Sequence, residues 1–326
     1  MMQKISPEES EKLDSRVEDA IIIAAGLGTR MLPASLYYPK EMLPLVDSPG
    51  IHHLIREARK AGARRIHLVV SEEKISAFRE IGLKGRQKIS DGIRTDLPNH
   101  QLDPVTEDME LKIHIQKSPR GVGDAILCAL GDIHGSFIVI MGDNILLPRK
   151  GSFALSKSFD GSEASLELVN RYKITGKPVA GVFAVNVSEI HNYGIVNTSN
   201  GMVERITEKP NSDEVQSNLA LCGRFVFPQG VKEILEMTEI SEMGELQSIG
   251  LLNYLIENVG LEVHEFEEYS FLDSGEPVSW LKAQIEHAIF REDLRNEIIP
   301  WIEEVLVSVK GGLDELGGNS EPFGNN

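Results

Sequence analysis

Two glycines near the N-terminus lie in a segment whose residue types suit a phosphate ligand. Residues 24–33 read A-A-G-L-G-T-R-M-L-P, so Gly26 and Gly28 are followed directly by Thr29 and Arg30. Glycine lets the backbone approach a polyanion closely and present N–H groups to it, and a guanidinium donates to phosphate oxygens in a fixed fork. Lys40 lies at the far end of the same loop. Two glycines alone would fit an ordinary strand-to-helix turn equally well, so the phosphate interpretation depends on the rest of the chain.

Other glycine motifs for nucleotides do not fit this segment. A dinucleotide fingerprint needs a third glycine where this chain has Met31, and no G-x-x-x-x-G-K-[ST] sequence occurs. A hydride-transfer enzyme or a P-loop enzyme is therefore disfavoured. The sequence also offers no Ser/His/Asp or Cys/His arrangement that predicts a protein nucleophile.

Asp143 is a second residue placed for chemistry. It follows the apolar run at residues 137–141, which predicts a buried strand with Gly142-Asp143 at its carboxyl end. Ligands of open α/β sheets bind at the carboxyl ends of the strands, so Asp143 and the Gly26 loop are expected to face one crevice. Taken alone, an aspartate after a strand is more often a cap.

The elements around these residues predict an α/β fold. A buried strand at residues 19–25 and a loop at 26–44 precede a helix that Asp47 or Ser48 is expected to cap, with Pro49 in its first turn and Gly62 at its end. The next strand, at 65–71, completes a βαβ unit and implies parallel pairing. Residues 72–110 are polar and are expected to hold a helix and a long excursion, followed by a strand at 111–117 and a helix at 123–130.

The second half of the chain alternates differently. Strands with short connections are expected at 165–169, 180–186, 194–198 and 202–207, with Asn200-Gly201 as a hairpin turn, and helices at 277–290 and 291–309 with a break at Pro300. The fold expected is a Rossmann-like mixed, mostly parallel sheet flanked by helices, with a smaller mixed-sheet extension over the far side of the crevice and C-terminal helices.

The motifs from residue 19 to about 286 resemble, in order, those of the sugar nucleotidyltransferases, or sugar-nucleotide pyrophosphorylases. G-L-G-T-R at residues 26–30 matches the signature of that family, and P-K-E-M-L-P at 39–44 matches the variant typical of bacterial-type UTP–glucose-1-phosphate uridylyltransferases. The resemblance implies nucleotidyl transfer from UTP to a sugar 1-phosphate, with glucose 1-phosphate expected, giving a UDP-sugar and pyrophosphate. It divides the chain into an N-terminal polar segment (1–18), a nucleotidyltransferase domain (19–286), a helical segment (287–310) and a loose tail (311–326).

The resemblance also assigns roles to individual residues of the nucleotide side. Catalytic roles fall to Arg30 and Lys40, which would hold the phosphates, and to Asp143 and Lys209. Gln116, followed by R-G-V-G-D-A at 120–125, corresponds to the base-reading segment, since an amide both donates and accepts. The nucleotide-binding residues expected are Ala25, Gly26, Leu27, Gly28, Thr29, Arg30, Lys40, Gln116, Gly121 and Asp143. Mg²⁺ is the cofactor implied, on Asp143 and on Asp273 of the sequence F-L-D-S-G.

The sugar-phosphate side corresponds to later motifs. Y-G at 193–194, T-E-K-P at 207–210 and the segment 218–224 match it, which implies binding by Gly194, Glu208, Lys209, Asn218 and Gly223. The segment 244–249, G-E-L-Q-S-I, departs from the family's D-E-I-Q-L-T-D because the closing acid is missing. Alternatives therefore stay open: a dTTP-dependent or other sugar-1-phosphate nucleotidyltransferase, a catalytically silent nucleotide-sugar-binding homologue, or an assembly subunit built on the apolar C-terminal helices.

Composition limits the partners. The 326 residues carry a formal net charge of −17, which disfavours a nucleic-acid backbone or an anionic membrane as partner. The N-terminal segment lacks the apolar core of a secretory signal, and no apolar run approaches the roughly 20 residues of a membrane helix, so a cytoplasmic address is expected. Cys128 and Cys222 are expected to be free thiols, and the nine histidines form no zinc motif. We expect a homo-oligomer, a dimer or a tetramer.

Overall fold

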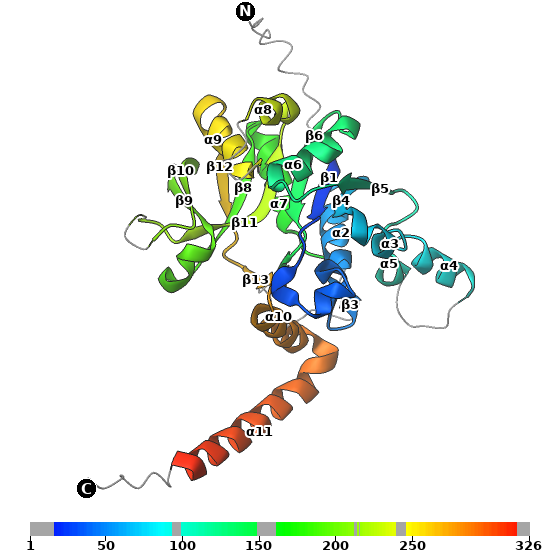
Figure 1. Cartoon of the computed structure of the whole chain (residues 1–326), viewed down its shortest axis with the longest axis vertical. Coiled ribbons are helices and arrows are strands. Elements are labelled where there is room, and N and C mark those ends of the chain that lie inside the picture. Colours follow the sequence, from blue (N-terminus) through cyan, green and yellow to red (C-terminus); the bar gives the residue numbers. More distant parts are fainter. Residues whose placement is uncertain are drawn as a thin grey trace, which may run out of the picture.

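A nine-stranded mixed sheet organises the chain (Figure 1). The structure is a computed structural model that describes residues 16–92, 99–148, 161–211, 214, 216–238 and 246–317. The strand order is β5-β4-β1-β6-β11-β8-β12-β10-β9. The sheet contains β1 (Val17–Ala24), β4 (Arg65–Ser71), β5 (Glu110–Gln116), β6 (Ser136–Met141), β8 (Val179–Ala184), β9 (Gly194–Ser199), β10 (Met202–Glu208), β11 (Leu219–Phe227) and β12 (Glu262–Glu265).

The two halves of the sheet pair differently. Strands β5, β4, β1 and β6 are parallel, as the βαβ pattern predicted, whereas β11 is antiparallel to both β6 and β8. The β9–β10 hairpin turns at Asn200 and Gly201, which have φ of 51° and 77°, the positive values that a tight hairpin needs. The mixed α/β class is thus confirmed, and the predicted extension continues the same sheet rather than forming another.

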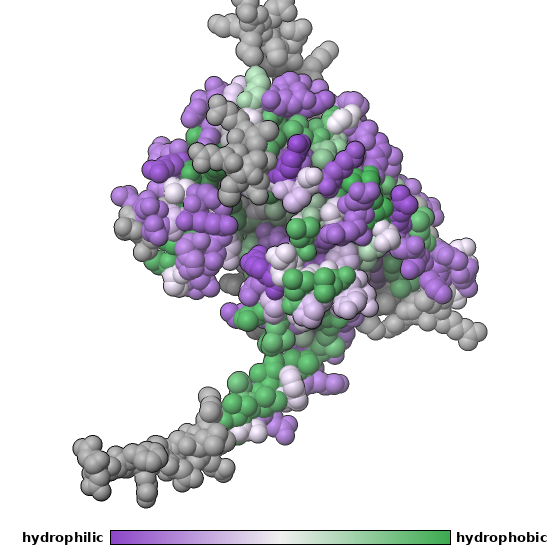
Figure 2. Space-filling model, in the orientation of Figure 1, coloured by the Kyte–Doolittle hydropathy of each residue, from purple (hydrophilic) through white to green (hydrophobic). Residues whose placement is uncertain are grey.

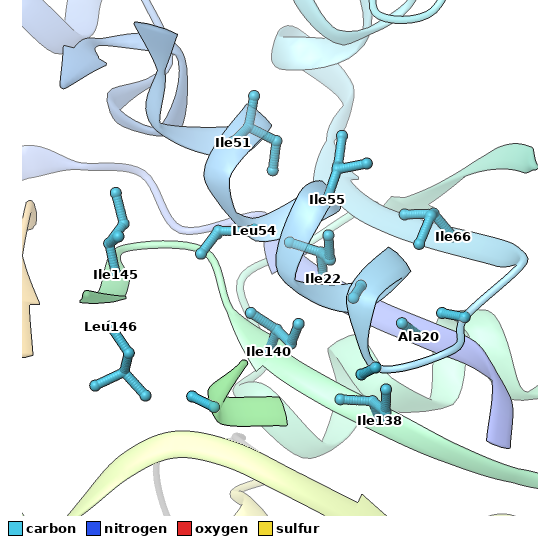
Figure 3. Close-up of a cluster of buried hydrophobic side chains, with 14 of the residues drawn as sticks. Ala20, Ile22, Ile51, Leu54, Ile55, Ile66, Ile138, Ile140, Ile145 and Leu146 are labelled. Atoms are coloured by element: carbon cyan, nitrogen blue, oxygen red, sulfur yellow. The ribbon is translucent and has the colours of Figure 1, made fainter. Parts of the chain in front are cut away.

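Alternation of side chains along the strands builds a core on each face. Ala20, Ile22 and Ile140 point to one face of the sheet and pack against helix α2 (Gly50–Lys60). Figure 3 shows Ile51 and Leu54 of this helix beside them. The intervening residues of the same strands pack on the other face. The helices on that second face are α6 (Val122–Ala129), α8 (Val231–Met237) and α9 (Ser248–Asn258). A strand buried on both faces needs this continuous apolar composition.

Two small sheets and the shorter elements complete the described chain. Sheet β7–β13 joins Asn144–Pro148 to Tyr269–Asp273, and β2–β3 joins Pro44–Leu45 to Ser48–Pro49. The short helices between β4 and β5 are α3 (Ile75–Phe78), α4 (Lys84–Ser90) and α5 (Asn99–Leu102). Both cysteines are free, and burial raises the pKa of the Cys222 thiol to about 12.

Several predictions of local structure were wrong. Residues 165–169 are not a strand but part of helix α7 (Ala164–Thr175), whose buried residues recur at helical spacing, at 164, 165, 168, 169 and 172. Helix α2 begins at Gly50 without a side-chain cap, because Asp47 instead accepts from Arg291, and Ser48 accepts from Arg56.

The C-terminal helices also differ from the prediction. Helix α10 spans Pro277–Phe290 as expected, but α11 (Glu292–Gly317) continues through Pro300, although proline lacks the N–H that an interior helical residue donates. Residues 311–317 are therefore helical rather than tail, and 318–326 lie outside the described residues. Helix α11 extends away from the body, and Figure 2 shows apolar side chains along it. Within the described part of the chain, no helix is both long and apolar enough to cross a bilayer.

Candidate active site

The glycine-bearing loop begins where β1 ends. Gly28 has a φ of 68°, a left-handed conformation that glycine adopts without strain, and it leads into the short 3-10 turn Thr29–Met31. Gly26 has open space where a Cβ would be. Leu27, Thr29 and Arg30 are exposed beside it. The loop thus presents backbone and a guanidinium to the crevice at the carboxyl edge of the sheet.

Lys40 and Asp143 meet at this edge. Lys40 Nζ lies 2.6 Å from Asp143 Oδ2, although the two residues are 103 positions apart. Lys40 is 9% exposed and Asp143 23%. Asp143 lies between β6 and β7, as predicted, so the ends of the parallel strands bring the loop cation and the strand-end carboxylate together. Coulomb interactions between groups this poorly hydrated are several times stronger than in water.

Asp273 lies beside Asp143 because β13 pairs with β7. Asp273 is opposite Asn144 in that pairing, and Ser274 donates two hydrogen bonds to the Asp143 carbonyl. A Cβ on Gly275 would lie 2.8 Å from Asp273 Oδ1, 2.9 Å from an Arg30 guanidinium nitrogen and 3.5 Å from Asp143 Oδ2, so these groups surround one small space. Burial, and then the charge of Asp143, raise the pKa of Asp273. Two crowded carboxylates form a donor set that a hard divalent cation prefers.

Sequence reasoning missed a second cation under the loop. Lys74, just after β4, is 7% exposed and donates to the backbone carbonyls of Ala24 and Gly26, at 3.0 and 2.5 Å. Its third partner is the carboxylate of Glu41, 3.1 Å away and 1% exposed. Burial raises the pKa of Glu41, against the opposing charges of Lys74 and Lys40. Lys74 therefore fixes the base of the glycine loop, a role that only the fold reveals.

Gln116 is oriented by its neighbours. Its Nε2 donates to the Gly121 carbonyl at 3.0 Å and to Asp124 Oδ2 at 2.9 Å. Both partners are acceptors, so the amide orientation follows from chemistry. The two N–H groups are engaged within the protein, which leaves the Gln116 oxygen as an acceptor for a ligand. We expected this amide both to donate to a ligand and to accept from it, but the structure leaves it free only to accept.

One cavity unites most of the predicted nucleotide residues. It has a volume of about 280 Å³ and is lined by Ala25, Gly26, Lys40, Gln116, Gly121 and Asp143, among others. Gln247 also lines it, from the segment that departs from the family pattern; Gly244 and Glu245 of that segment lie outside the described residues. A neighbouring cavity of about 420 Å³ shares Ala25 and Gln116 and adds Leu27.

The predicted sugar-side residues are more dispersed. A larger cavity of about 700 Å³ is lined by Asn218 and Asp273, and by Tyr193 next to Gly194. Gly194 and Glu208 face each other across the β9–β10 hairpin, and Lys209 is exposed with a φ of 45°. Neither Glu208 nor Lys209 lines these cavities.

Gly223 is buried in β11 rather than presented to a cavity. A Cβ there would lie 2.4 Å from the Met141 side chain, which lines the 280 Å³ cavity. Gly223 thus allows close packing behind the site. This placement differs from the direct contact that the resemblance implied.

A buried ion pair supports the strand end that carries Asp143. Arg224 donates from Nε and Nη2 to the two carboxylate oxygens of Glu57, at 2.8 and 3.1 Å. Its Nη2 also donates to the Asn144 carbonyl at 2.6 Å. Arg224 is 0% exposed and Glu57 1%. Removing one partner of such a pair leaves an uncompensated buried charge, so this pair holds the β6–β7 turn in place.

Known proteins are similar to the chain over most of its length. The chain is 33% identical to a UTP–glucose-1-phosphate uridylyltransferase of Bacillus subtilis (strain 168) over 302 residues, covering 89% of this chain and 98% of that protein. It is 31% identical to UTP–glucose-1-phosphate uridylyltransferase 1 of Staphylococcus saprophyticus, over 89% of this chain and 99% of that one.

Solved structures share the fold of the chain. A UDP-glucose pyrophosphorylase from Acinetobacter baumannii superposes with a TM-score of 0.74 at 26% identity, covering 89% of this chain and 100% of that one. A UTP-bound form from the same organism gives 0.72 at 27% identity, over 89% and 99% of the two chains. A sequence model of the nucleotidyl transferases matches residues 19–288. The chain belongs to the nucleotidyl transferase family.

Proposed function

We propose that the chain transfers the uridylyl group of UTP to glucose 1-phosphate, giving UDP-glucose and pyrophosphate. The Lys40–Asp143 pair beside the glycine loop, in the cavity that also holds Gln116, is the observation that carries the proposal. The names of the similar proteins, which specify UTP and glucose 1-phosphate, support the choice of substrates.

In the proposed reaction, an oxygen of the sugar 1-phosphate attacks the α-phosphorus of UTP in line. The bond from the α-phosphorus to the bridging oxygen of the β-phosphate breaks, and pyrophosphate leaves with that electron pair. No protein nucleophile is needed. Catalysis then depends on alignment and on neutralising the anionic groups that meet.

Individual residues take distinct parts in this scheme. Lys40 stabilises charge at the reacting phosphate, Arg30 holds the leaving pyrophosphate, and backbone N–H groups of the glycine loop bind the triphosphate. Asp143 and Asp273 would hold Mg²⁺, which supplies charge neutralisation between the two reactants when bound. The Gln116 oxygen accepts from the N3–H of uracil.

The sugar side is assigned by proximity and by the family resemblance. Asn218 borders the large cavity together with Asp273. Glu208 and Lys209, on the hairpin beside it, would receive the sugar hydroxyls and its phosphate, with Gly194 allowing close approach. Gly223 would act through its packing on Met141.

A substrate panel tests the proposal. Four nucleoside triphosphates are each combined with the 1-phosphates of glucose, galactose and N-acetylglucosamine, and pyrophosphate release is measured. We expect the highest rate with UTP and glucose 1-phosphate. We expect dTTP to exceed CTP, since thymine shares the N3–H that cytosine lacks, and an unpaired buried acceptor costs about 1–3 kcal/mol. A silent binding protein or an assembly subunit would release no pyrophosphate.

We also propose self-association of the chain through α11. Its exposed residues include Trp301, Val305, Leu306 and Val307. A helix that faces only solvent seldom exposes so many large apolar side chains close together. Light scattering on the full chain is expected to give a dimer or tetramer, and Leu306→Glu to lower the mass. A monomer at micromolar concentration would contradict this.

A further inference from the structure

A cluster of two histidines and an aspartate lies away from the nucleotide cavity, between β4, β5 and the turn after α6. The ligand atoms of His67, His114 and Asp132 all lie within 4.8 Å of one another. His67 and His114 are 47 residues apart, and the parallel pairing of β4 with β5 brings them together, with His114 opposite Val69. No sequence motif reveals such a set, which is why none was predicted.

The outer partners fix the form of His67. Its Nε2 lies 3.0 Å from Asp19 Oδ1. Arg65 holds both oxygens of the Asp19 carboxylate at 2.7 Å, and the hydrogen bonds of His67 and Arg65 keep its pKa low although burial, the largest contribution, raises it. An ionised carboxylate accepts, so His67 donates from Nε2. Its other ring nitrogen, Nδ1, faces His114.

His114 supplies the second ring nitrogen. Its Nε2 lies 3.0 Å from His67 Nδ1. The ring also hydrogen-bonds to the backbone of Cys128, in the last turn of α6, where carbonyl groups lack intrahelical partners. The Nε2 atom of His114 is the ring atom near both His67 and Asp132.

The two facing nitrogens and the Asp132 carboxylate lie close enough to share one metal ion, which would replace the direct hydrogen bond between the rings. Asp132 Oδ2 lies 4.0 Å from His114 Nε2, and its side chain is 50% exposed, which gives access from solvent. In a tetrahedral zinc site with Zn–N of about 2.0–2.1 Å the two nitrogens lie about 3.3 Å apart, close to the 3.0 Å seen here. The Asp19 carboxylate behind His67 is the outer-shell partner that metal-bound histidines usually have.

We propose that His67, His114 and Asp132 bind Zn²⁺, or a divalent transition metal of similar preference, with water as the fourth ligand. The ion ties β4 to β5 and to the end of α6. It is distinct from the proposed magnesium site, since imidazole ligands suit zinc and carboxylates alone suit magnesium.

The test measures metal binding directly. The full chain is stripped with a chelator and titrated with Co²⁺ in millimolar Mg²⁺, which saturates the carboxylate site. We expect one equivalent of Co²⁺ with the visible absorption of a tetrahedral complex. His114→Gln is expected to abolish it, and Asp132→Asn, a half-exposed position that spares the fold, to weaken it by tenfold or more. The control His134→Gln changes an exposed histidine two residues beyond Asp132 and is expected to bind normally.

Thermal unfolding gives a second readout. Zn²⁺ is expected to raise the Tm of the parent and of His134→Gln, and to leave His114→Gln unchanged. The proposal is overturned if the parent binds no Co²⁺ in the presence of Mg²⁺, or if both cluster variants bind as the parent does. A titrating imidazolium at His114 in metal-treated protein, seen by NMR, would also overturn it. None of these outcomes depends on uridylyl transfer.

Discussion

Lys74→Met tests whether a buried cation supports the triphosphate loop. The substitution keeps the length and apolar stem of the side chain but removes the ammonium that Glu41 and the carbonyls of Ala24 and Gly26 share. Glu41 is 1% exposed and Lys74 7%. Breaking one side of a buried ion pair costs about 3–5 kcal/mol. Because a domain has roughly 5–15 kcal/mol of stability, the variant should remain folded but weakened.

The effect should depend on pH. Burial already raises the pKa of Glu41 above 4.5 with Lys74 present, and removing Lys74 raises it further. When the pKa of a carboxyl group is higher in the folded state than in the unfolded state, the protein loses stability as the pH rises from 4.5 through the folded-state pKa. Urea unfolding should therefore show a smaller deficit for Lys74→Met at pH 5 than at pH 8.

Enzyme kinetics separate a loop effect from general weakening. We expect the KM for UTP to rise in Lys74→Met, while the KM for the sugar 1-phosphate stays near its parent value. Lys60→Met is the matched control: its partner Glu163 is 59% exposed, and such pairs contribute about 0–1 kcal/mol. If Lys74→Met unfolds at the same urea concentration as Lys60→Met, the assignment of Lys74 is wrong.

Three further predictions concern the site and the fold. Asp143→Asn should lower kcat roughly 100-fold or more with an unchanged circular dichroism spectrum; near-normal turnover in Mg²⁺ would reject Asp143 as a ligand. Lys209→Ala should mainly raise the KM for the sugar 1-phosphate, whereas Lys40→Ala should mainly lower kcat, and an unchanged Lys209→Ala enzyme would mean that the phosphate binds elsewhere. Burial holds the pKa of His53 well below 6.5 and lowers that of His287 to about 4, so both side chains take up protons on unfolding. The free energy of unfolding should therefore fall by up to roughly 2.7 kcal/mol per pH unit as the pH drops from 6.5 to 5. Urea unfolding across that range, repeated with His53→Gln/His287→Gln, should show a flatter slope in the variant.

Some elements could be predicted from the sequence because their signals are local. The strand at 65–71 and the helix at 277–290 were predicted with the bounds that the structure gives. Residues 165–169 misled the prediction because five residues can show both periods, and only the longer run to Thr175 reveals the helix. Pro300 was predicted to break the helix because proline disfavours a helix interior, but the exposed helix α11 continues through it.

The site divides in the same way. Gly28 and Asp143 could be placed from motif and strand order, and the fold brings Asp143 to Lys40. Lys74, Glu41 and the His67–His114 pair escaped sequence reasoning because their partners are distant in the chain and meet through strand pairing. The engagement of Gln116 by Asp124 likewise follows from a turn geometry that no spacing rule specifies.

The fate of a ³²P label in UTP tests most directly the central claim, that the chain transfers a uridylyl group to glucose 1-phosphate. The full chain is incubated with glucose 1-phosphate, Mg²⁺ and UTP carrying ³²P at either the α or the γ position, and the products are separated. The proposed in-line attack predicts that the α label appears in UDP-glucose and the γ label in pyrophosphate, in equal amounts. Release of the α label as UMP would show transfer to water, and release of the γ label as inorganic phosphate would show cleavage at the γ-phosphorus; either result would contradict uridylyl transfer to glucose 1-phosphate.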